Sequence, residues 1–322
     1  MQDRAHNELD LLAREVLGAH WGIREPPVRV EIGVNRQIWR VGQRWLSCTI
    51  EQRAAQVRRE LRLSLRLGKR ARLPAGVAVP APLSGREGPL VSACGRVWWL
   101  TGHVAGRRPE PAARVDTIAV VRGLAGLHRW LKPLSPDLAV ASEDSLTLFA
   151  HAQELLADTR LLGFSLTDQA TLQQACELIE AYLSIRLPSP RQLIHGDPSY
   201  PNLRLSHGPL PRLIGALDWE ECRLDFPLSD LSTVGQTVVF RAGLSDPLAG
   251  LAGIHAIYCQ HTSSRFELRD LLMFMLLGKF ESIAHHGTRF VGGEAPQELV
   301  LSQAAKMRTL LDLLRQVSGQ GR

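Results

Sequence analysis

Two short stretches of the sequence place polar side chains directly after apolar residues. In the first, His195, Asp197 and Asn202 follow the pair Leu-Ile. In the second, Asp218 and Glu220 follow the run Leu-Ile-Gly-Ala-Leu. An apolar strand that ends at carboxylate and amide groups can hold a catalytic set on a rigid support. We therefore expect two strands whose polar ends build one site.

The residue types in these stretches suit phosphoryl transfer. That reaction needs in-line positioning, metal ions that neutralise the phosphate oxygens and a carboxylate that orients the acceptor hydroxyl. Asn202 follows Asp197 across a turn that contains Pro198 and Pro201, and we expect this return to bring its carbonyl oxygen to the metal. Asp218 comes from the second strand, and Mg²⁺ prefers hard oxygen ligands of this kind. The prediction is that Asp197, Asn202 and Asp218 share one cleft.

The order of these motifs resembles that of a known family. The pattern H-G-D-x-x-x-x-N (His195 to Asn202), followed by D-W-E (Asp218 to Glu220), is similar to the aminoglycoside phosphotransferase and choline kinase family, distant relatives of the protein kinases. The segment L-A-G-L-H (Leu124 to His128) matches a short signature of that family, and Asp230 matches an Asp at the start of a later helix. The resemblance covers about residues 25–290, although only the central block is specific.

The resemblance implies a role for each central residue. Asp197 is the implied catalytic base, and Asn202 and Asp218 are the implied Mg²⁺ ligands, with ATP or GTP as co-substrate. The implied supporting residues are His195, which braces the loop, Asp230, which accepts its backbone N–H groups, and Glu220, a secondary metal contact or a carboxylate behind the metal ligands.

The resemblance also implies nucleotide contacts in the N-terminal part. Gly33 and Asn35 lie in a turn between two expected strands, where the family covers the phosphates. A helix expected over residues 53–68 carries Glu60, which in kinase-like proteins pairs with a lysine that holds the phosphates. Thr101 and His103 belong to a Gly-bounded break that corresponds to the hinge, where backbone groups would bind the adenine edge.

The sequence departs from the family pattern at that lysine. The third strand is expected over residues 45–50, and residues 45–52 contain no Lys or Arg. Arg40 and Arg44 are two candidate substitutes, and Glu60 is equally well explained as a solvated carboxylate among arginines. The departure motivates an alternative function, a weak or inactive kinase-like protein that binds a nucleotide or a partner.

The expected architecture is an α+β, two-lobed, protein-kinase-like fold. Residues 1–103 form the predicted N-lobe, with a leading helix, a small and mostly antiparallel sheet and one further helix. Residues 104–322 form the predicted helical C-lobe with the catalytic and metal-binding loops. Its helices are expected over 115–131, 146–162, 166–185, 228–240, 248–261, 266–285 and 296–317.

Composition narrows the class of protein. The 322 residues are 45% hydrophobic and 22% charged, with a formal net charge of +6, which is typical of a globular protein. No nucleic-acid motif accompanies the positive charge, so we predict no nucleic-acid partner. The five cysteines form no C-x-x-C pair, the first residues lack the apolar core of a signal peptide, and no run is long enough to cross a membrane. We expect a cytoplasmic protein.

The acceptor is expected to be a small molecule with a hydroxyl group. The family includes kinases of aminoglycosides, macrolides, choline, homoserine, methylthioribose and sugars. A polycationic aminoglycoside needs an acidic cleft, and the region after Phe240 contains no acidic run. Its candidate carboxylates, each better explained as a solvated surface charge, are Asp246, Glu267, Asp270 and Glu281. The acceptor, the choice of ATP or GTP and the oligomeric state stay open.

Overall fold

A computed structural model of the chain describes residues 2–30, 36–69, 76–134, 143–185 and 190–319. They divide into two compact units. The first contains Met1–Gly106 and Ile214–Glu220, and the second contains Arg107–Leu213 and Glu221–Arg322. The sequence analysis places the boundary after residue 103 and keeps residues 214–220 with the helical part, so the two divisions differ at these points.

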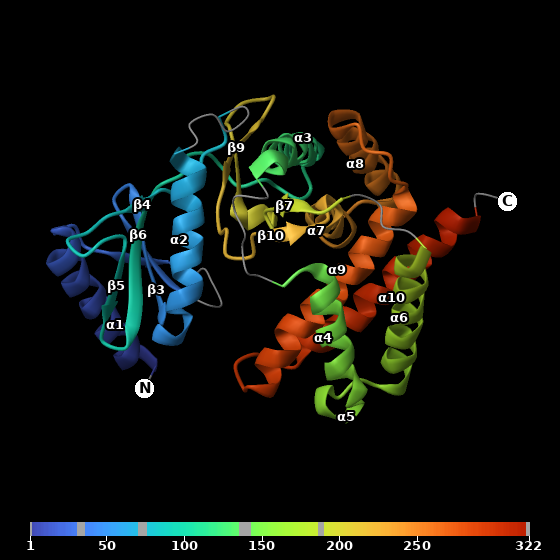
Figure 1. The fold of residues 1–322 in the computed structure, drawn as a ribbon, viewed down its shortest axis with the longest axis horizontal. Helices are drawn as coiled ribbons and strands as arrows, with labels where there is room; N and C mark the ends of the chain where they lie inside the picture. The colour runs from blue at the N-terminus through green and yellow to red at the C-terminus, as the bar shows by residue number, and fades with distance from the viewer. Residues whose placement is uncertain (1, 31–35, 70–75, 135–142, 186–189, 320–322) are drawn as a thin grey trace. The chain divides into compact units, whose positions relative to one another are not determined.

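The first unit is built on an antiparallel sheet (Figure 1). Its strands follow the order β1-β2-β3-β6-β4, and β5 also pairs with β6. Their bounds are β1 Val28–Val30, β2 Gln37–Val41, β3 Arg44–Ile50, β4 Pro82–Leu83, β5 Leu90–Ala93 and β6 Arg96–Gly102.

One face of this sheet packs on the leading helix, α1 (Gln2–Val16). Successive side chains of a strand point to opposite faces, and Trp98 of β6 lies on this side. Its ring stacks on Trp39 of β2 at a centroid distance of 5.6 Å. The Trp39 indole N–H donates to Asp10 of α1 at 2.6 Å. The buried polar atom of Trp39 is therefore satisfied by the helix that covers it.

The opposite face of the sheet packs on α2 (Ala54–Lys69). Val57 and Leu61 of this helix contact Val97 and Trp99, which alternate with Trp98 along β6. Glu60 lies one turn after Val57 on the same side of α2. The helix predicted over residues 53–68 is thereby confirmed, and it carries Glu60 toward the sheet.

The segment Ile214–Glu220 belongs to the first unit through a backbone bridge. The Ala78 N–H donates to Ile214 O at 2.7 Å, and the Ala216 N–H donates to Ala78 O at 3.0 Å. Trp219 is buried, and its indole N–H donates to Ala216 O at 2.9 Å. These bonds hold the turn after β9 (Leu213–Ala216), on which Asp218 and Glu220 stand.

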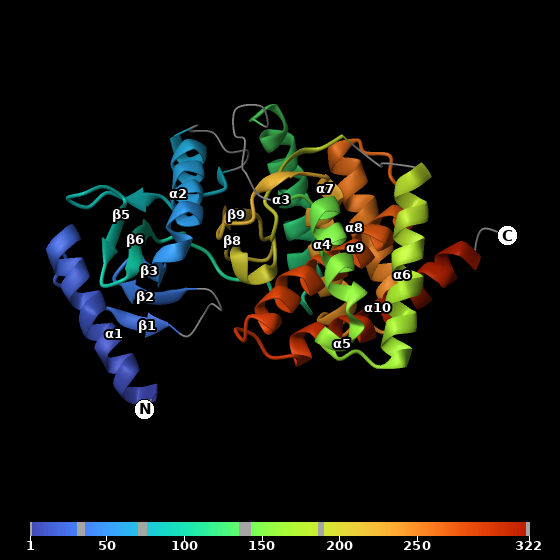
Figure 2. The same cartoon turned by 60° about the horizontal axis from the view of Figure 1, so that its bottom comes forward.

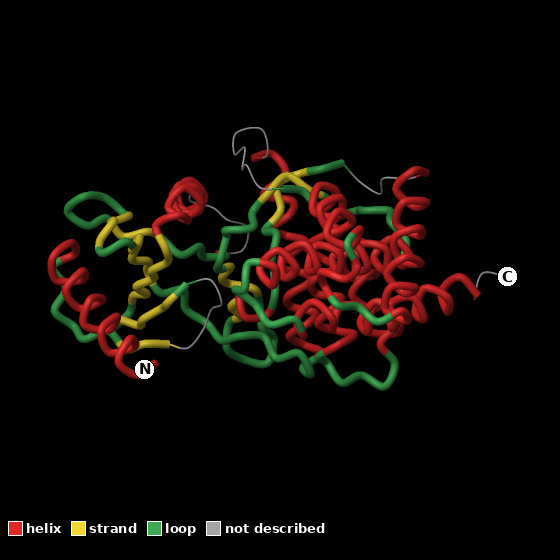
Figure 3. Tube along the Cα trace, turned by 90° about the horizontal axis from the view of Figure 1, so that it is seen from below, coloured by secondary structure: helices red, strands yellow, loops and turns green. Residues whose placement is uncertain are grey.

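The second unit is mainly helical (Figures 2 and 3). In its interior α9 contacts α4, α7 and α10, and one side chain after another along α9 is buried. The helix bounds are α3 Arg114–Leu131, α4 Ser145–Ala157, α5 Thr159–Leu162, α6 Leu166–Ile185, α7 Pro227–Phe240, α8 Pro247–Thr262, α9 Leu268–Val291 and α10 Glu298–Gly319.

These elements agree with the predicted helices except at residues 146–162. The single helix predicted there is wrong, because Asp158 leaves the helical region (φ −101°, ψ 80°) and separates α4 from α5. The strand expected before His195 is present as β7 (Gln192–Ile194), which pairs antiparallel with β10 (Arg223–Asp225). β8 (Leu203–Leu205) follows Asn202. The antiparallel sheet and the helical unit confirm the α+β fold class.

Candidate functional site

The loop after β7 brings Asp197 and Asn202 together. The Asn202 amide N–H₂ donates to the Asp197 carboxylate at 2.8 Å and to the Asp197 carbonyl at 3.1 Å. The backbone N–H and the hydroxyl of Ser199 each lie 3.3 Å from the same carboxylate. Since the Asn202 nitrogen faces Asp197, the amide oxygen points the other way and can serve as a ligand.

The buried carboxylate of Asp230 holds the start of this loop through hydrogen bonds. Asp230, in the first turn of α7, is fully buried. It accepts the backbone N–H groups of His195 at 2.9 Å and of Gly196 at 2.8 Å. It also accepts a hydrogen bond from His128 Nε2 at 2.9 Å. The start of the H-G-D loop is therefore tied to a helix through backbone donors that no side-chain change can remove.

His128 extends the network to Tyr258 of α8. The His128 ring lies between the two groups, with Nε2 at 2.9 Å from the Asp230 carboxylate and Nδ1 at 2.5 Å from the Tyr258 hydroxyl. Burial by itself would raise the pKa of Asp230. The hydrogen bond from His128, the attraction of His128 and His195 and the backbone donors outweigh burial and hold that pKa below its ordinary value.

Gly196 is required by a close approach inside the loop. Its φ is +90°, a region that L side chains rarely adopt, and an added Cβ would overlap with the carbonyl group of Glu221. The backbone after Asp218 thus passes against the Gly196 backbone, with no space for a side chain.

The first unit holds a second set of charged groups. The Arg36 guanidinium lies 2.5 Å from Asp218 Oδ1, 2.7 Å from Glu220 Oε2 and 3.5 Å from Glu60 Oε1. It also stands over the ring of Trp99, 5.5 Å from the centroid. Predicted residues from α2 and from the turn after β9 are thereby joined by an arginine.

Burial and the neighbouring charges shift the pKa values of Glu60 and Arg36 in this cluster. Desolvation, with the charges of Asp218 and Glu220, raises the pKa of Glu60 to about 7, and Arg36 acts in the opposite direction. Burial would lower the pKa of Arg36, but the three carboxylates raise it above its ordinary value. Asp218 has a φ of +61°, which is uncommon for a residue with a side chain, so its carboxylate is aimed by a strained turn.

The cluster has the donor set of a divalent-cation site. Carboxylate oxygens of Glu60, Asp218 and Glu220 lie within 4.8 Å of one another. Three carboxylates face one guanidinium, which leaves a surplus of negative charge. All the donors are hard oxygens, the kind that Mg²⁺ prefers, so these residues fit the ion.

Arg36 is the functional candidate that the sequence analysis missed. The substitutes expected from the sequence, Arg40 and Arg44, lie on or next to the second and third strands, whereas Arg36 immediately precedes β2. The signal in the sequence was that a basic residue follows directly after Gly33–Asn35 and precedes the expected second strand. Gly33 and Asn35 themselves lie outside the described residues.

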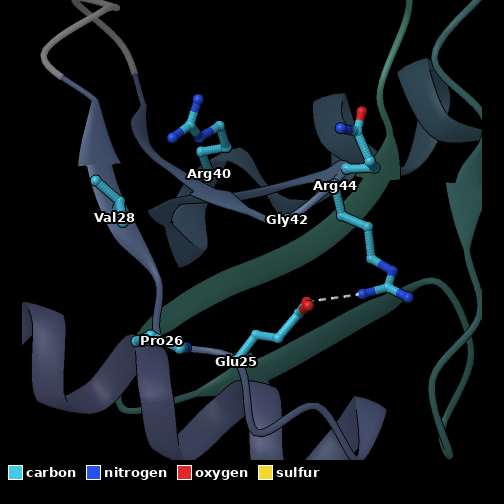
Figure 4. Close-up of a pocket in the computed structure, with 7 residues that line it drawn as sticks. Glu25, Pro26, Val28, Arg40, Gly42 and Arg44 are labelled. Carbon is cyan, nitrogen blue, oxygen red and sulfur yellow. Dashed lines mark hydrogen bonds and ion pairs between the residues drawn. The ribbon is translucent and has the colours of Figure 1, made fainter.

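The two arginines proposed as substitutes lie elsewhere. Arg44 pairs with Glu25 at 3.2 Å. Arg40, Arg44 and Glu25 line an open pocket of about 550 Å³ beside β1 and β2 (Figure 4). This pocket contains none of the carboxylates of the cluster, and Glu60 pairs with Arg36.

Thr101 and His103 lie at the end of β6. Thr101 is paired with Trp45 and Pro82 in the sheet. The His103 backbone N–H donates to Gln43 O at 3.0 Å, so this donor is engaged within the unit. The Trp45 indole N–H donates to His103 Nδ1 at 3.1 Å, which places the proton of a neutral His103 on Nε2.

The carboxylates proposed for acceptor recognition have structural partners. Asp246 caps α8 by accepting the Ala249 N–H, and Glu267 and Asp270 form a capping box at the start of α9. The interpretation as solvated charges is wrong for Asp270, which is buried. It is also wrong for Glu281, which accepts a hydrogen bond from buried Arg223 at 2.9 Å. Both charges are needed within the unit.

These features, an antiparallel sheet with a carboxylate cluster and a helical unit with an H-G-D loop, define a kinase-like phosphotransferase fold. A model of the phosphotransferase enzyme family matches residues 29–260. The chain belongs to this family, which confirms the predicted class of enzyme, a phosphotransferase with an alcohol group as acceptor. No curated protein sequence matches the chain.

Several solved structures share the fold of this chain. The Streptomyces rimosus aminoglycoside phosphotransferase in complex with ADP and streptomycin is 17% identical over 84% of this chain and 98% of that chain (TM-score 0.59). A GDP complex of an aminoglycoside 2'-phosphotransferase is 12% identical over 93% and 99% (TM-score 0.70). A type I macrolide 2'-phosphotransferase is 17% identical over 94% and 96% (TM-score 0.60).

A further finding concerns membranes. Within the described parts of the chain, none of the helices combines the length and the apolar character needed to cross a bilayer.

The close approach at Gly196 predicts a large loss of stability in Gly196→Ala. The variant combines a left-handed backbone with overlap against the Glu221 carbonyl. We expect its free energy of unfolding to fall by about 3–5 kcal/mol. Gly208→Ala is the matched control, because Gly208 has φ +108° with nothing within 4 Å of the added Cβ, and it should lose about 1–2 kcal/mol. Urea unfolding measures both, and equal losses would exclude the overlap.

The Asp230 network predicts a pH dependence of stability. Because the folded pKa of Asp230 is depressed, its contribution is present above its ordinary pKa, about 4, and is lost as the pH falls through the lower folded value. Asp230→Asn should lower the free energy of unfolding at pH 7 by about 3–5 kcal/mol and flatten the acid limb of the pH profile. Asp312→Asn, at an exposed position, should leave both nearly unchanged.

Proposed function

We propose that this protein is a small-molecule kinase that transfers the terminal phosphoryl group of ATP or GTP to a hydroxyl group. The observation that carries the proposal is the hydrogen bond between Asn202 and the Asp197 carboxylate. It sets a proton acceptor and an amide in one loop, which Asp230 holds through the backbone. Family membership over residues 29–260 includes all of these residues.

In this proposal Asp197 is the catalytic base, the group that accepts the proton of the acceptor hydroxyl. Its carboxylate already accepts hydrogen bonds from Asn202 and Ser199, which restrict its rotation. A fixed carboxylate orients the hydroxyl without reorganisation during the reaction. His195 supports the loop, because its ring lies next to the Asp197 N–H at 3.3 Å.

Asn202 and Asp218 would hold Mg²⁺, with Glu220 as a further carboxylate beside Asp218. The ion, when bound, supplies positive charge that neutralises the phosphate oxygens. The Asn202 amide oxygen faces away from Asp197 and is available as a ligand. The carboxylates of Asp218 and Glu220 already pair with a cation, the Arg36 guanidinium. Gly33, Asn35, Thr101 and His103 remain proposed nucleotide contacts.

Arg36 takes the place of the lysine that the third strand lacks. It pairs with Glu60, as the family's lysine is expected to do, and reaches the carboxylates proposed for the metal. A guanidinium offers several donors to phosphate oxygens. This pairing gives Glu60 a cationic partner without a lysine on the third strand, which favours the active kinase over the alternative, a weak or inactive kinase-like protein that binds a nucleotide or a partner.

Nucleotide and acceptor follow the same proposal. Related structures are complexes with ADP and streptomycin, or with GDP, so both ATP and GTP are candidate co-substrates. We propose a small hydroxyl compound as the acceptor, without nucleic acid or membrane as a partner. The five cysteines are free thiols, which is in keeping with a cytoplasmic location.

Replacing the proposed base gives the direct test. Asp197→Asn keeps the size of the side chain but cannot accept the proton, so kcat should fall by about 10²–10⁴-fold. Nucleotide affinity, measured by thermal shift with Mg²⁺, should change little. Asp312→Asn is the control for removing one carboxylate. If Asp197→Asn left every ADP- or GDP-releasing activity intact, the proposed mechanism would be wrong.

Arg36 is tested by two measurements with opposite expected signs. Arg36→Met should lower phosphoryl transfer by about 10²-fold, because the cation that holds the phosphates is lost. Without nucleotide, the same variant should bind Mn²⁺ roughly tenfold more tightly, measured by electron paramagnetic resonance, since a competing charge is removed. Arg44→Met, which breaks only the pair with Glu25, should change neither.

The alternative function makes a different forecast for the wild-type protein. A protein that only binds would show Mg²⁺-dependent nucleotide binding with no ADP or GDP release in an acceptor screen. Turnover by the wild-type protein together with its loss in Asp197→Asn would exclude that alternative.

A further inference from the structure

The helical unit contains a lysine whose side chain is largely buried and whose ammonium group has no hydrogen-bond acceptor among the described residues. Lys279 of α9 is 4% exposed. Its Nζ stands 5.8 Å from the ring centroid of Phe240, at the end of α7. In the described part of the chain no hydrogen bond or ion pair satisfies it. A charge on a largely buried side chain is costly without a partner, and an apolar residue of similar volume would fill the same space.

The neighbours of Lys279 add positive charge around its ammonium group. Lys306 of α10 and Arg241, directly after α7, act on it as further positive charges. Burial and these two charges lower the pKa of Lys279 to about 7. The acidic neighbour, Glu281, acts in the opposite direction, but its carboxylate is engaged by Arg223 at 2.9 Å.

Two further polar side-chain atoms without a hydrogen-bond partner in the described ranges lie along α9. His286 lies two turns after Lys279 and Arg289 one turn further, and buried His286 Nδ1 and Arg289 Nε have no hydrogen-bond partner among the described residues. Arg289 Nε is 3.8 Å from Glu294 Oε2, too far for a hydrogen bond. Burial and the positive groups around His286 lower its pKa to about 4.

We propose that Lys279, Lys306 and Arg241 bind an oxyanion, a carboxylate or phosphate group of a small molecule, where α7, α9 and α10 meet. Several cations with unused N–H groups are the complement of such an anion. Arg241 is exposed and Lys306 half-buried, so two of the three cations are accessible to an anion in solution. Among the described residues, the Lys306 ammonium has only the Ser302 hydroxyl, at 3.5 Å, as a hydrogen-bond partner.

The oxyanion has two candidate sources. It is either an acidic group of the acceptor itself or a free anion that binds apart from the reaction. The first source rests on the proposed function and would make the acceptor anionic, unlike a polycationic aminoglycoside. The second source is independent of the proposed function.

The binding test uses inorganic phosphate and full-length protein at constant ionic strength, with Mg²⁺-ADP present to fill nucleotide phosphate subsites. Phosphate, compared with chloride, should raise the wild-type Tm by about 3 °C or more at saturation. Lys279→Met should lose most of this shift while its Tm without phosphate stays equal or rises, because an unpaired buried charge is removed. Arg315→Met, at an exposed position on α10, is the control and should keep the full shift.

Arg241→Met provides a second variant that leaves the interior intact, and it should weaken phosphate binding by calorimetry about tenfold. The proposal is overturned if phosphate gives no shift beyond chloride, or if Lys279→Met and Arg241→Met retain the wild-type affinity. The source is identified by comparing phosphoryl transfer to glycerate and to glycerol. A preference for glycerate that Lys279→Met abolishes assigns the oxyanion to the acceptor, whereas phosphate binding without such a preference assigns it to a free anion.

Discussion

The position of the H-G-D loop depends on one buried negative charge. Asp230 accepts the backbone N–H groups of His195 and Gly196 and the imidazole of His128. A carboxylate in an apolar interior is stable only when its oxygens are satisfied by donors, and here two of the donors belong to the loop itself. The unit cannot satisfy Asp230 without holding the H-G-D loop in place, so folding and preorganisation of Asp197 are one event.

In the first unit, the main electrostatic feature is a cluster of three carboxylates around one arginine. Three carboxylates converge in a partly buried place, and like charges at this separation repel one another. Arg36 relieves that repulsion through pairs with Glu60, Asp218 and Glu220. A divalent cation would relieve the same repulsion, so the arginine and the ion are alternative partners for one set of oxygens. In the protein without nucleotide, Arg36 therefore stabilises the cluster of three carboxylates.

Much of the fold was predictable because its signals are local. The spacing of apolar residues predicts the helices. The break at Asp158 was not predicted, because the apolar pattern continues through it. The roles of Asp270 and Glu281 were misread for a related reason. A charged residue on a helix is usually exposed, and only packing shows that Asp270 caps α9 from a buried position and that Glu281 meets Arg223.

By itself, the sequence determined the class of protein, because the order and spacing of His195, Asp197, Asn202 and Asp218 are local properties of the chain. Tertiary structure alone decided which cation meets Glu60, because Arg36 and Glu60 come from separate elements, and no spacing rule links a residue before β2 to the middle of α2. The same holds for the unpaired charge of Lys279. Whether a charge is satisfied depends on which helices pack around it, and that is a property of the fold.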